Sequence, residues 1–181
     1  MGVFTARAVL VGGALTLTGG AAAQAPPDLS GRWTAVAAAP AAGGRGATSA
    51  ATIGSGWGAD FTITQSAAAL VVDRAQFSQY DMQPPMRFRY ALDGSETRHT
   101  INMGRGPQEL VSKAAWRGAT LVITTTFRFT DPQTGKPATS DVTHALALDS
   151  SGALVIATTR SGAAGAAPTT SSTTYHKVER P

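Results

Sequence analysis

The sequence predicts an all-β protein, an antiparallel up-and-down β-barrel of about 8–10 strands. Three observations support this prediction. Apolar and polar residues alternate with a period of two in many short segments, turn-forming residues separate these segments, and no segment keeps a helical period for more than about two turns. Because the connections are too short for parallel crossovers, consecutive strands should pair antiparallel in chain order.

The composition limits the classes of protein that this chain can represent. It has 181 residues, which fits one domain, and it contains no cysteine. The lack of cysteine excludes disulfides, thiolate zinc sites, iron–sulfur clusters and cysteine nucleophiles. The net charge is +4, the basic residues are scattered, and the single Arg87-Phe88-Arg89 triplet is weak evidence for a nucleic-acid surface. We therefore expect no nucleic-acid partner.

Residues 1–23 show the order of regions that is typical of an export signal. Arg7 supplies a positive charge, residues 8–17 are apolar, and three alanines precede the expected cleavage after Ala23. The apolar stretch is much shorter than the roughly 20 residues of a membrane-spanning helix, so no membrane span is expected. The alternative is a buried N-terminal helix, which the glycine pairs would weaken. We expect a periplasmic or secreted protein with one domain at 24–181.

Five strands are expected in the first half of this domain. The first begins at Leu29, and the clearest alternation follows later, where large apolar residues alternate with Arg87 and Arg89. Asp93-Gly94 after that strand is a tight-turn signal. The expected ranges are 29–38, 61–64, 69–74, 86–92 and 97–103.

Five more strands are expected in the second half. Turn signals separate them at Arg117-Gly118, at 131–135 and at 149–152. The longest of these strands carries alternate residues on one face, namely Leu121, Ile123, Thr125, Phe127 and Phe129. The expected ranges are 112–116, 120–130, 141–148, 154–160 and 171–178.

Two segments lack any apolar period and are rich in small residues, at 39–56 and 161–168. Their side chains bury too little apolar area to offset roughly 1–2 kcal/mol per residue of backbone ordering. Long irregular segments inside a domain are often lids or disordered insertions. We therefore expect two mobile loops.

Several segments of the sequence carry recognisable motifs of strands and turns. The sequence LSGRW at 29–33 follows the export signal, and FTITQ stands at 61–65. Later motifs are Y-x-LDGSE at 90–96, S-x-A-x-W-x-G-x-x-L-V-I at 112–123, the hairpin at 148–156, and Tyr175. These motifs resemble those of exported bacterial proteins with a lipocalin-like (calycin-type) β-barrel, which are mostly uncharacterised. The resemblance implies a lipocalin-like barrel. Its motifs concern strands, turns and packing tryptophans, so they indicate fold more than chemistry.

A candidate ligand-binding wall lies on the strand at 86–92. Four large side chains share its inward face, while the two arginines point outward, and the following strand should bring two more residues alongside through the Asp93-Gly94 turn. Tyr90 and His99 would be the polar groups of an otherwise apolar wall, which suits a lipid-like or aromatic molecule. The alternative is that this face only packs against Leu121, Ile123 and Phe127. The six candidate residues are Met86, Phe88, Tyr90, Leu92, His99 and Ile101.

Other chemistry finds little support in the sequence. His99, His144 and His176 have no metal-ligand spacing. If His99 and His144 converged inside a barrel, they could bind a metal or a haem, but histidines satisfied by one hydrogen bond are the alternative. The sequence has no Gly-x-Ser-x-Gly motif, and we assign no catalytic residue, no metal and no cofactor.

The resulting expectation is an exported barrel, not an enzyme, that binds an apolar small molecule. Small barrels also use large side chains simply to fill themselves. A structural or interaction module of the cell envelope with a filled core therefore stays open, as does an enzyme with a cryptic site. Trp33 and Trp116 are expected in the core, and the oligomeric state is open.

Overall fold

The computed structural model describes residues 25–36, 56–58, 60–74, 77–78, 81–82, 86–102, 107–130, 135–161 and 167–179. The expected export signal at 1–23 lies outside the described residues. So does nearly all of the expected loop at 39–56, together with residues 162–166 of the second loop.

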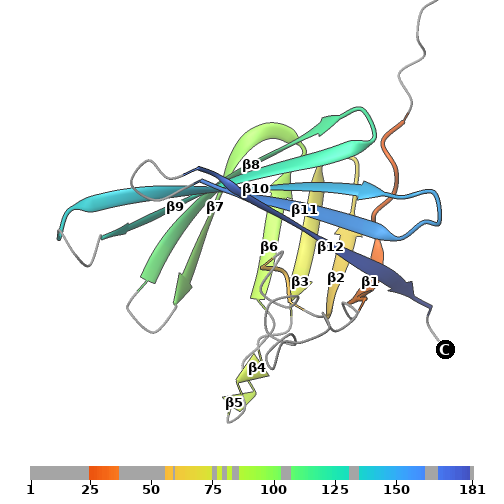
Figure 1. Cartoon of the computed structure of the whole chain (residues 1–181), viewed down its shortest axis with the longest axis horizontal. Coiled ribbons are helices and arrows are strands. Elements are labelled where there is room, and N and C mark those ends of the chain that lie inside the picture. The colour runs from red at the N-terminus through yellow and green to blue at the C-terminus, as the bar shows by residue number, and fades with distance from the viewer. Residues whose placement is uncertain are drawn as a thin grey trace, which may run out of the picture.

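The described part of the chain is an antiparallel, nearly closed β-barrel, which confirms the predicted fold class (Figure 1). Ten strands form one sheet in the order β6-β3-β2-β1-β12-β11-β10-β9-β8-β7. Their bounds are β1 Gly31–Ala35, β2 Asp60–Gln65, β3 Ala69–Arg74, β6 Met86–Ala91, β7 Asp93–Asn102, β8 Pro107–Arg117, β9 Thr120–Thr130, β10 Pro137–Leu148, β11 Leu154–Arg160 and β12 Thr169–Val178. A separate pair, β4 Phe77–Ser78 and β5 Asp81–Met82, was not expected. No helix in the described residues has the length and hydropathy needed to cross a membrane.

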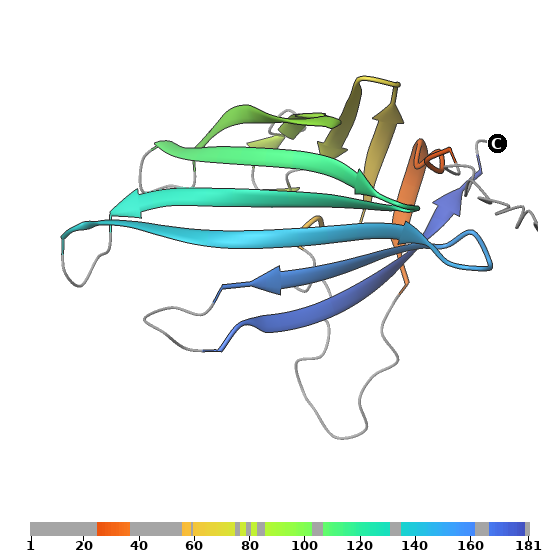
Figure 2. The ribbon, with the colours of Figure 1, turned by 90° about the horizontal axis from the view of Figure 1, so that it is seen from above.

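All ten expected strands are present, and the main differences are in length. β8 begins at Pro107 and β10 at Pro137, four or five residues earlier than expected. Proline is tolerated as the first residue of a strand because the missing N–H lies at the end of the ladder. The longer β8, β9 and β10 make one wall of the barrel taller than the wall formed by β1, β2, β3 and β6 (Figure 2).

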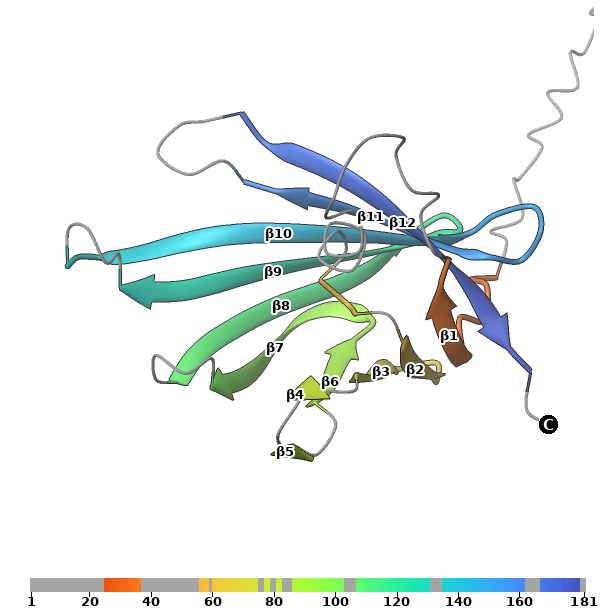
Figure 3. The same ribbon diagram turned by 60° about the horizontal axis from the view of Figure 1, so that its bottom comes forward.

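The expectation of antiparallel pairing in chain order is wrong for β6 and β7. These consecutive strands lie at the two edges of the sheet and approach each other where the sheet curls round (Figure 3). The expected tight turn at Asp93-Gly94 is part of β7, where the register with β8 shifts between Asp93 and Glu96. Gly94 has a φ of +84°. Such a bulge bends and twists the strand. β7 therefore pairs with β8 and not with β6, and we call the unpaired boundary between β6 and β7 the seam.

The core lies inside the barrel and confirms the predicted alternation. The largest group of mutually packed buried residues is drawn from nearly every strand: Leu29, Trp33, Trp57, Phe61, Ile63, Leu70, Val72, Phe88, Tyr90, Ala114, Leu121, Ile123, Leu146, Leu154, Ile156 and Tyr175. Trp33 is 1% exposed, as expected of a core residue. Trp116 differs from the expectation because it is only partly buried and packs against the edge of the core.

One end of the barrel is held by the segment before β1. The Trp33 indole N–H donates to the Leu29 carbonyl at 2.9 Å. The Gln65 side chain accepts from the Leu29 N–H at 3.0 Å and donates to the Pro27 carbonyl at 3.1 Å. These bonds satisfy backbone groups that no strand pairing reaches, and they seat Leu29, which is fully buried, against the core.

Candidate functional site

A histidine side chain bridges the seam between β6 and β7. The backbone N–H of Arg89 on β6 donates to Nε2 of His99 on β7 at 2.9 Å. Since Nε2 is the acceptor, we assign the neutral ring's proton to Nδ1. The Nδ1 atom is buried and has no hydrogen-bond partner. His99 therefore fixes the seam with one nitrogen and leaves a buried N–H donor on the other.

The structure brings together the central part of the predicted wall. Phe88 and Tyr90 are each 4% exposed, and their rings are stacked with centroids 6.5 Å apart. The His99 ring lies against both, with centroid distances of 5.2 Å to Phe88 and 5.8 Å to Tyr90. The remaining candidates, Met86, Leu92 and Ile101, are partly buried and pack against the core. All six candidate residues therefore belong to the barrel interior or its margin.

The outward direction predicted for the two arginines of β6 is also correct. Arg87 and Arg89 are exposed. The Arg87 guanidinium donates to both carboxylate oxygens of Asp73, at 2.7 and 3.0 Å, on the outer face of β3. This bidentate pair raises the pKa of Arg87. β6 thus has one solvent-exposed face that carries the two arginines and one apolar face inside the barrel.

Arg74 is a member of the site that the sequence interpretation missed. It is the last residue of β3 and follows Leu70 and Val72 on the inward face. Its guanidinium carbon lies 4.1 Å from the ring centroid of Phe88 and 5.4 Å from that of Trp57. The same period-two alternation that placed the two apolar residues inside would have placed Arg74 there.

The polar contacts of Arg74 are few and come from neutral groups. Nη1 donates to the Gly56 carbonyl at 2.6 Å, and the guanidinium hydrogen-bonds to the Tyr90 hydroxyl. Nε is buried and has no partner. Burial lowers the pKa of Arg74 because a charged guanidinium loses hydration there, although nearby tyrosines oppose this shift.

The same environment shifts the neighbouring titratable groups. Burial raises the pKa of Tyr90, with the charge of Arg74 acting in the opposite direction. Burial lowers the pKa of His99, and the positive charge of Arg74 adds to that effect. At neutral pH the cluster therefore contains a cationic Arg74 beside a neutral phenol and a neutral imidazole.

A second aromatic group adjoins this cluster on the side of β2 and β12. Trp57 packs edge-on against Phe61, with centroids 5.2 Å apart, and lies 5.6 Å from the His144 ring. Phe61 also packs edge-on against Tyr175 at 4.8 Å, and the Tyr175 hydroxyl donates to the Gly58 carbonyl at 3.2 Å. Trp57 links the two groups because it contacts both Phe61 and Arg74.

Polar side chains from β8, β9, β11 and β12 also face the interior. Among the described residues, the buried polar ones are Ser112, Thr125, Thr158 and Thr173. The hydroxyls of Ser112 and Thr125 are 2.8 Å apart and bonded to each other. This polar pair lies between the apolar Ile123 level of the interior and the level of the buried Leu110.

The histidines do not form a metal site in the described residues. His99 lies at the seam, and His144 lies beside Trp57 on β10. The described residues contain no group of three or more His, Cys, Asp or Glu side chains placed to hold a metal ion.

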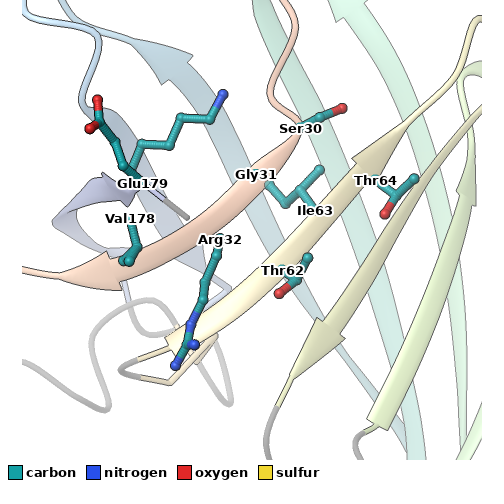
Figure 4. Close-up of a pocket in the computed structure, with 9 residues that line it drawn as sticks. Ser30, Gly31, Arg32, Thr62, Ile63, Thr64, Val178 and Glu179 are labelled. Atoms are coloured by element: carbon teal, nitrogen blue, oxygen red, sulfur yellow. The ribbon is translucent and has the colours of Figure 1, made fainter. Parts of the chain in front are cut away.

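A surface groove of about 840 Å³ lies elsewhere, where β1, β2 and β12 meet (Figure 4). It is half open, and two of its cationic side chains have neighbours: Arg32 is 3.7 Å from Asp60, and Lys177 lies over the Trp33 ring at 5.8 Å. None of the six predicted wall residues lines it. The groove is lined by Ser30, Gly31, Arg32, Thr62, Ile63, Thr64, Lys177, Val178 and Glu179.

No protein-family model matches this chain, and no curated protein matches it. The functional interpretation therefore depends on the geometry of the barrel and on its residues.

Proposed function

We propose that this protein is an exported binding barrel, without catalytic activity, whose ligand is an apolar small molecule held against β6 and β7. The observation that carries the proposal is the cluster of Phe88, Tyr90 and His99 inside the barrel, with a buried donor at His99 Nδ1 that has no protein partner. Ligand sites are mostly apolar with a few placed polar groups, and this wall has that composition.

The support for the ligand class comes from the side chains themselves. Stacked and tilted aromatic rings offer large apolar faces, and the partly buried Met86 and Ile101 continue them at the margin of the core. The polar groups within the wall are few, and the Nδ1–H of His99 is a donor without a protein partner. This combination suits a lipid-like or aromatic molecule better than a sugar, whose many hydroxyls would need more partners.

A second candidate function is a module of the cell envelope with a filled core. It is favoured by the fact that Phe88 and Tyr90 belong to the same buried group as Leu121 and Ile123. In that case the wall would serve packing alone. The two functions differ in one measurable property, which is saturable binding of an apolar molecule.

The test is a titration of the full mature chain with the neutral fluorescent probe N-phenyl-1-naphthylamine. The wild-type protein should bind it saturably, and Phe88→Ala and Tyr90→Phe should bind more weakly while circular dichroism shows an intact β fold. Tyr175→Phe is the matched control, because it also removes a buried hydroxyl but lies on β12 and outside the wall. No binding by the wild type, or equal binding by all variants, would favour the filled module.

Export is a separate part of this proposal and rests on residues 1–23 of the sequence. Expression of the full chain in a Gram-negative host should yield a periplasmic or secreted form. Its N-terminal sequence should begin at or near Gln24. A mature protein that retains residues 8–17 would contradict export.

A further inference from the structure

Arg74 is a partly buried positive charge on the inward face of β3, and its Nε atom is fully buried. Within the described residues no aspartate or glutamate forms an ion pair with it, and its named polar contacts are the Gly56 carbonyl and the Tyr90 hydroxyl. Two rings, those of Phe88 and Trp57, give it additional cation–π stabilisation. Burying a guanidinium is costly unless an anion and further hydrogen bonds compensate.

The acidic residues nearest to Arg74 in the sheet point to the outside. Asp73 precedes it in β3 and is bound by Arg87 at 2.7 Å. Asp60, at the start of neighbouring β2, lies 3.7 Å from Arg32. These two acids therefore pair with cations on the outer face, and Arg74 has no ion pair within the described residues.

Two buried hydrogen-bond donors flank the same aromatic ring. Arg74 Nε and His99 Nδ1 are both buried and both lack a partner. The guanidinium carbon is 4.1 Å from the Phe88 centroid, and the His99 ring centroid is 5.2 Å from it. A buried donor without an acceptor costs free energy, so these two groups mark a place where an acceptor from outside the chain would be stabilised.

Resting on the binding function proposed above, we propose that the ligand of the barrel is an apolar molecule with a single carboxylate. Arg74 receives the carboxylate at Nε, and the Nδ1–H of His99 donates to it as well. The apolar part of the ligand lies along Phe88 and the adjoining partly buried Met86. The binding pocket would thus distinguish an acid from a neutral molecule of the same shape.

The charge and geometry of the cluster favour a carboxylate over other anions. Arg74 carries one positive charge, whereas His99 accepts a hydrogen bond at Nε2 and is neutral in this arrangement. One charge balances a monoanion and not a dianionic phosphate. The Nε–H of Arg74 and the Nδ1–H of His99 also give two donors for the two oxygens of a carboxylate.

The experiment compares decanoate with decan-1-ol, which differ in the charged group and share the alkyl chain. Isothermal titration calorimetry on the full mature protein should show decanoate binding at least about tenfold more tightly than decan-1-ol. Arg74→Gln should lose this preference and keep the affinity for decan-1-ol. Arg87→Gln is the matched control, since it removes an exposed arginine from the neighbouring strand and should leave the preference intact.

The outcomes separate the two proposals. If neither compound binds the wild type, the binding function is wrong and the carboxylate inference is wrong with it. If both bind with equal affinity, the binding function stands and the inference is overturned. The wild-type comparison decides this even if Arg74→Gln does not fold. If Arg74→Gln folds and still prefers decanoate, Arg74 is not the carboxylate's partner.

Discussion

The imidazole of His99 joins two strands that share no ladder of backbone hydrogen bonds. Its Nε2 accepts from the N–H of Arg89 at 2.9 Å, across the seam between the edge strands β7 and β6. An unpaired edge exposes backbone donors and acceptors to water and to other chains. At this point a side chain takes the place of the missing partner strand, and its protonation state controls the contact.

This contact predicts a pH-dependent stability. Protonation of His99 would place a hydrogen on Nε2, opposite the N–H of Arg89, and would break this hydrogen bond. Burial and the charge of Arg74 lower the pKa of His99 below its usual 6.5. The unfolded chain therefore binds more protons than the folded chain below about pH 6.5, so the free energy of unfolding should fall as the pH drops from about 7.5 to about 5. Chemical denaturation at several pH values measures this slope.

The charged and titratable groups that face His99 are few, so a substitution of His99 itself tests the origin of the pH dependence. Arg74 from β3 and Tyr90 from β6 face it, whereas Arg98 and Glu109 point outward and pair with each other at 2.8 Å. His99→Gln should flatten the pH dependence because it removes the titrating ring. His176→Gln removes an exposed histidine on β12 and should preserve it. If the free energy of unfolding of His99→Gln depended on pH as strongly as that of the wild type, His99 would not be the group responsible.

The two tryptophans expected in the core should differ in their contribution to stability. Trp33 is 1% exposed and is anchored by its bond to the Leu29 carbonyl, so Trp33→Ala should lower the free energy of unfolding by about 3–5 kcal/mol. Trp116 is only partly buried, so Trp116→Ala should have a smaller effect. Urea unfolding monitored by far-UV circular dichroism compares them. An equal loss would show that Trp116 is more tightly packed in solution than its exposure indicates.

The strands could be predicted because their signal is local. Leu121 and Ile123, two of the inward residues of β9, are fully buried, as the period-two pattern predicts. The seam could not be predicted, because pairing in a barrel depends on how a long sheet twists and closes. The Asp93-Gly94 signal correctly marked a special backbone conformation but did not indicate that Gly94 would lie in a bulge of β7.

The candidate site was predicted in part for the same reason. The alternation in β6 identified Phe88 and Tyr90, and the short connection to β7 placed His99 beside them. Arg74 was missed because an arginine at the end of a strand is usually exposed. Its inward direction agrees with the alternation of Leu70 and Val72, and the register pairs it with Met86 of β6 and Phe61 of β2.

Gly31 at the start of β1 should resist substitution. Its φ of +144° is a conformation that residues with a side chain rarely adopt, and an added Cβ would meet the Lys177 side chain. Gly31→Ala should therefore lower the free energy of unfolding by about 1–3 kcal/mol. Gly118→Ala is the control, because Gly118 has a φ of +61° in an open turn with nothing within 4 Å of an added Cβ. Denaturant unfolding should show a smaller loss for the control; the reverse order would contradict strain at Gly31.

Arg74 should contribute little to the stability of the barrel, in contrast to its proposed role in binding. Its guanidinium bears a desolvation cost that only two neutral polar contacts and two rings offset. Replacing buried charges by apolar side chains of similar volume is often neutral or stabilising. Arg74→Met keeps a long side chain against Phe88, so it should change the free energy of unfolding by less than about 1 kcal/mol in either direction.

Arg87→Met is the control, because it loses an exposed ion pair and should have a similarly small effect. A loss of more than about 2 kcal/mol for Arg74→Met alone would mean that the arginine is held for the fold. A stable Arg74→Met barrel that has lost its preference for decanoate would instead show that this inward-facing charge serves the ligand.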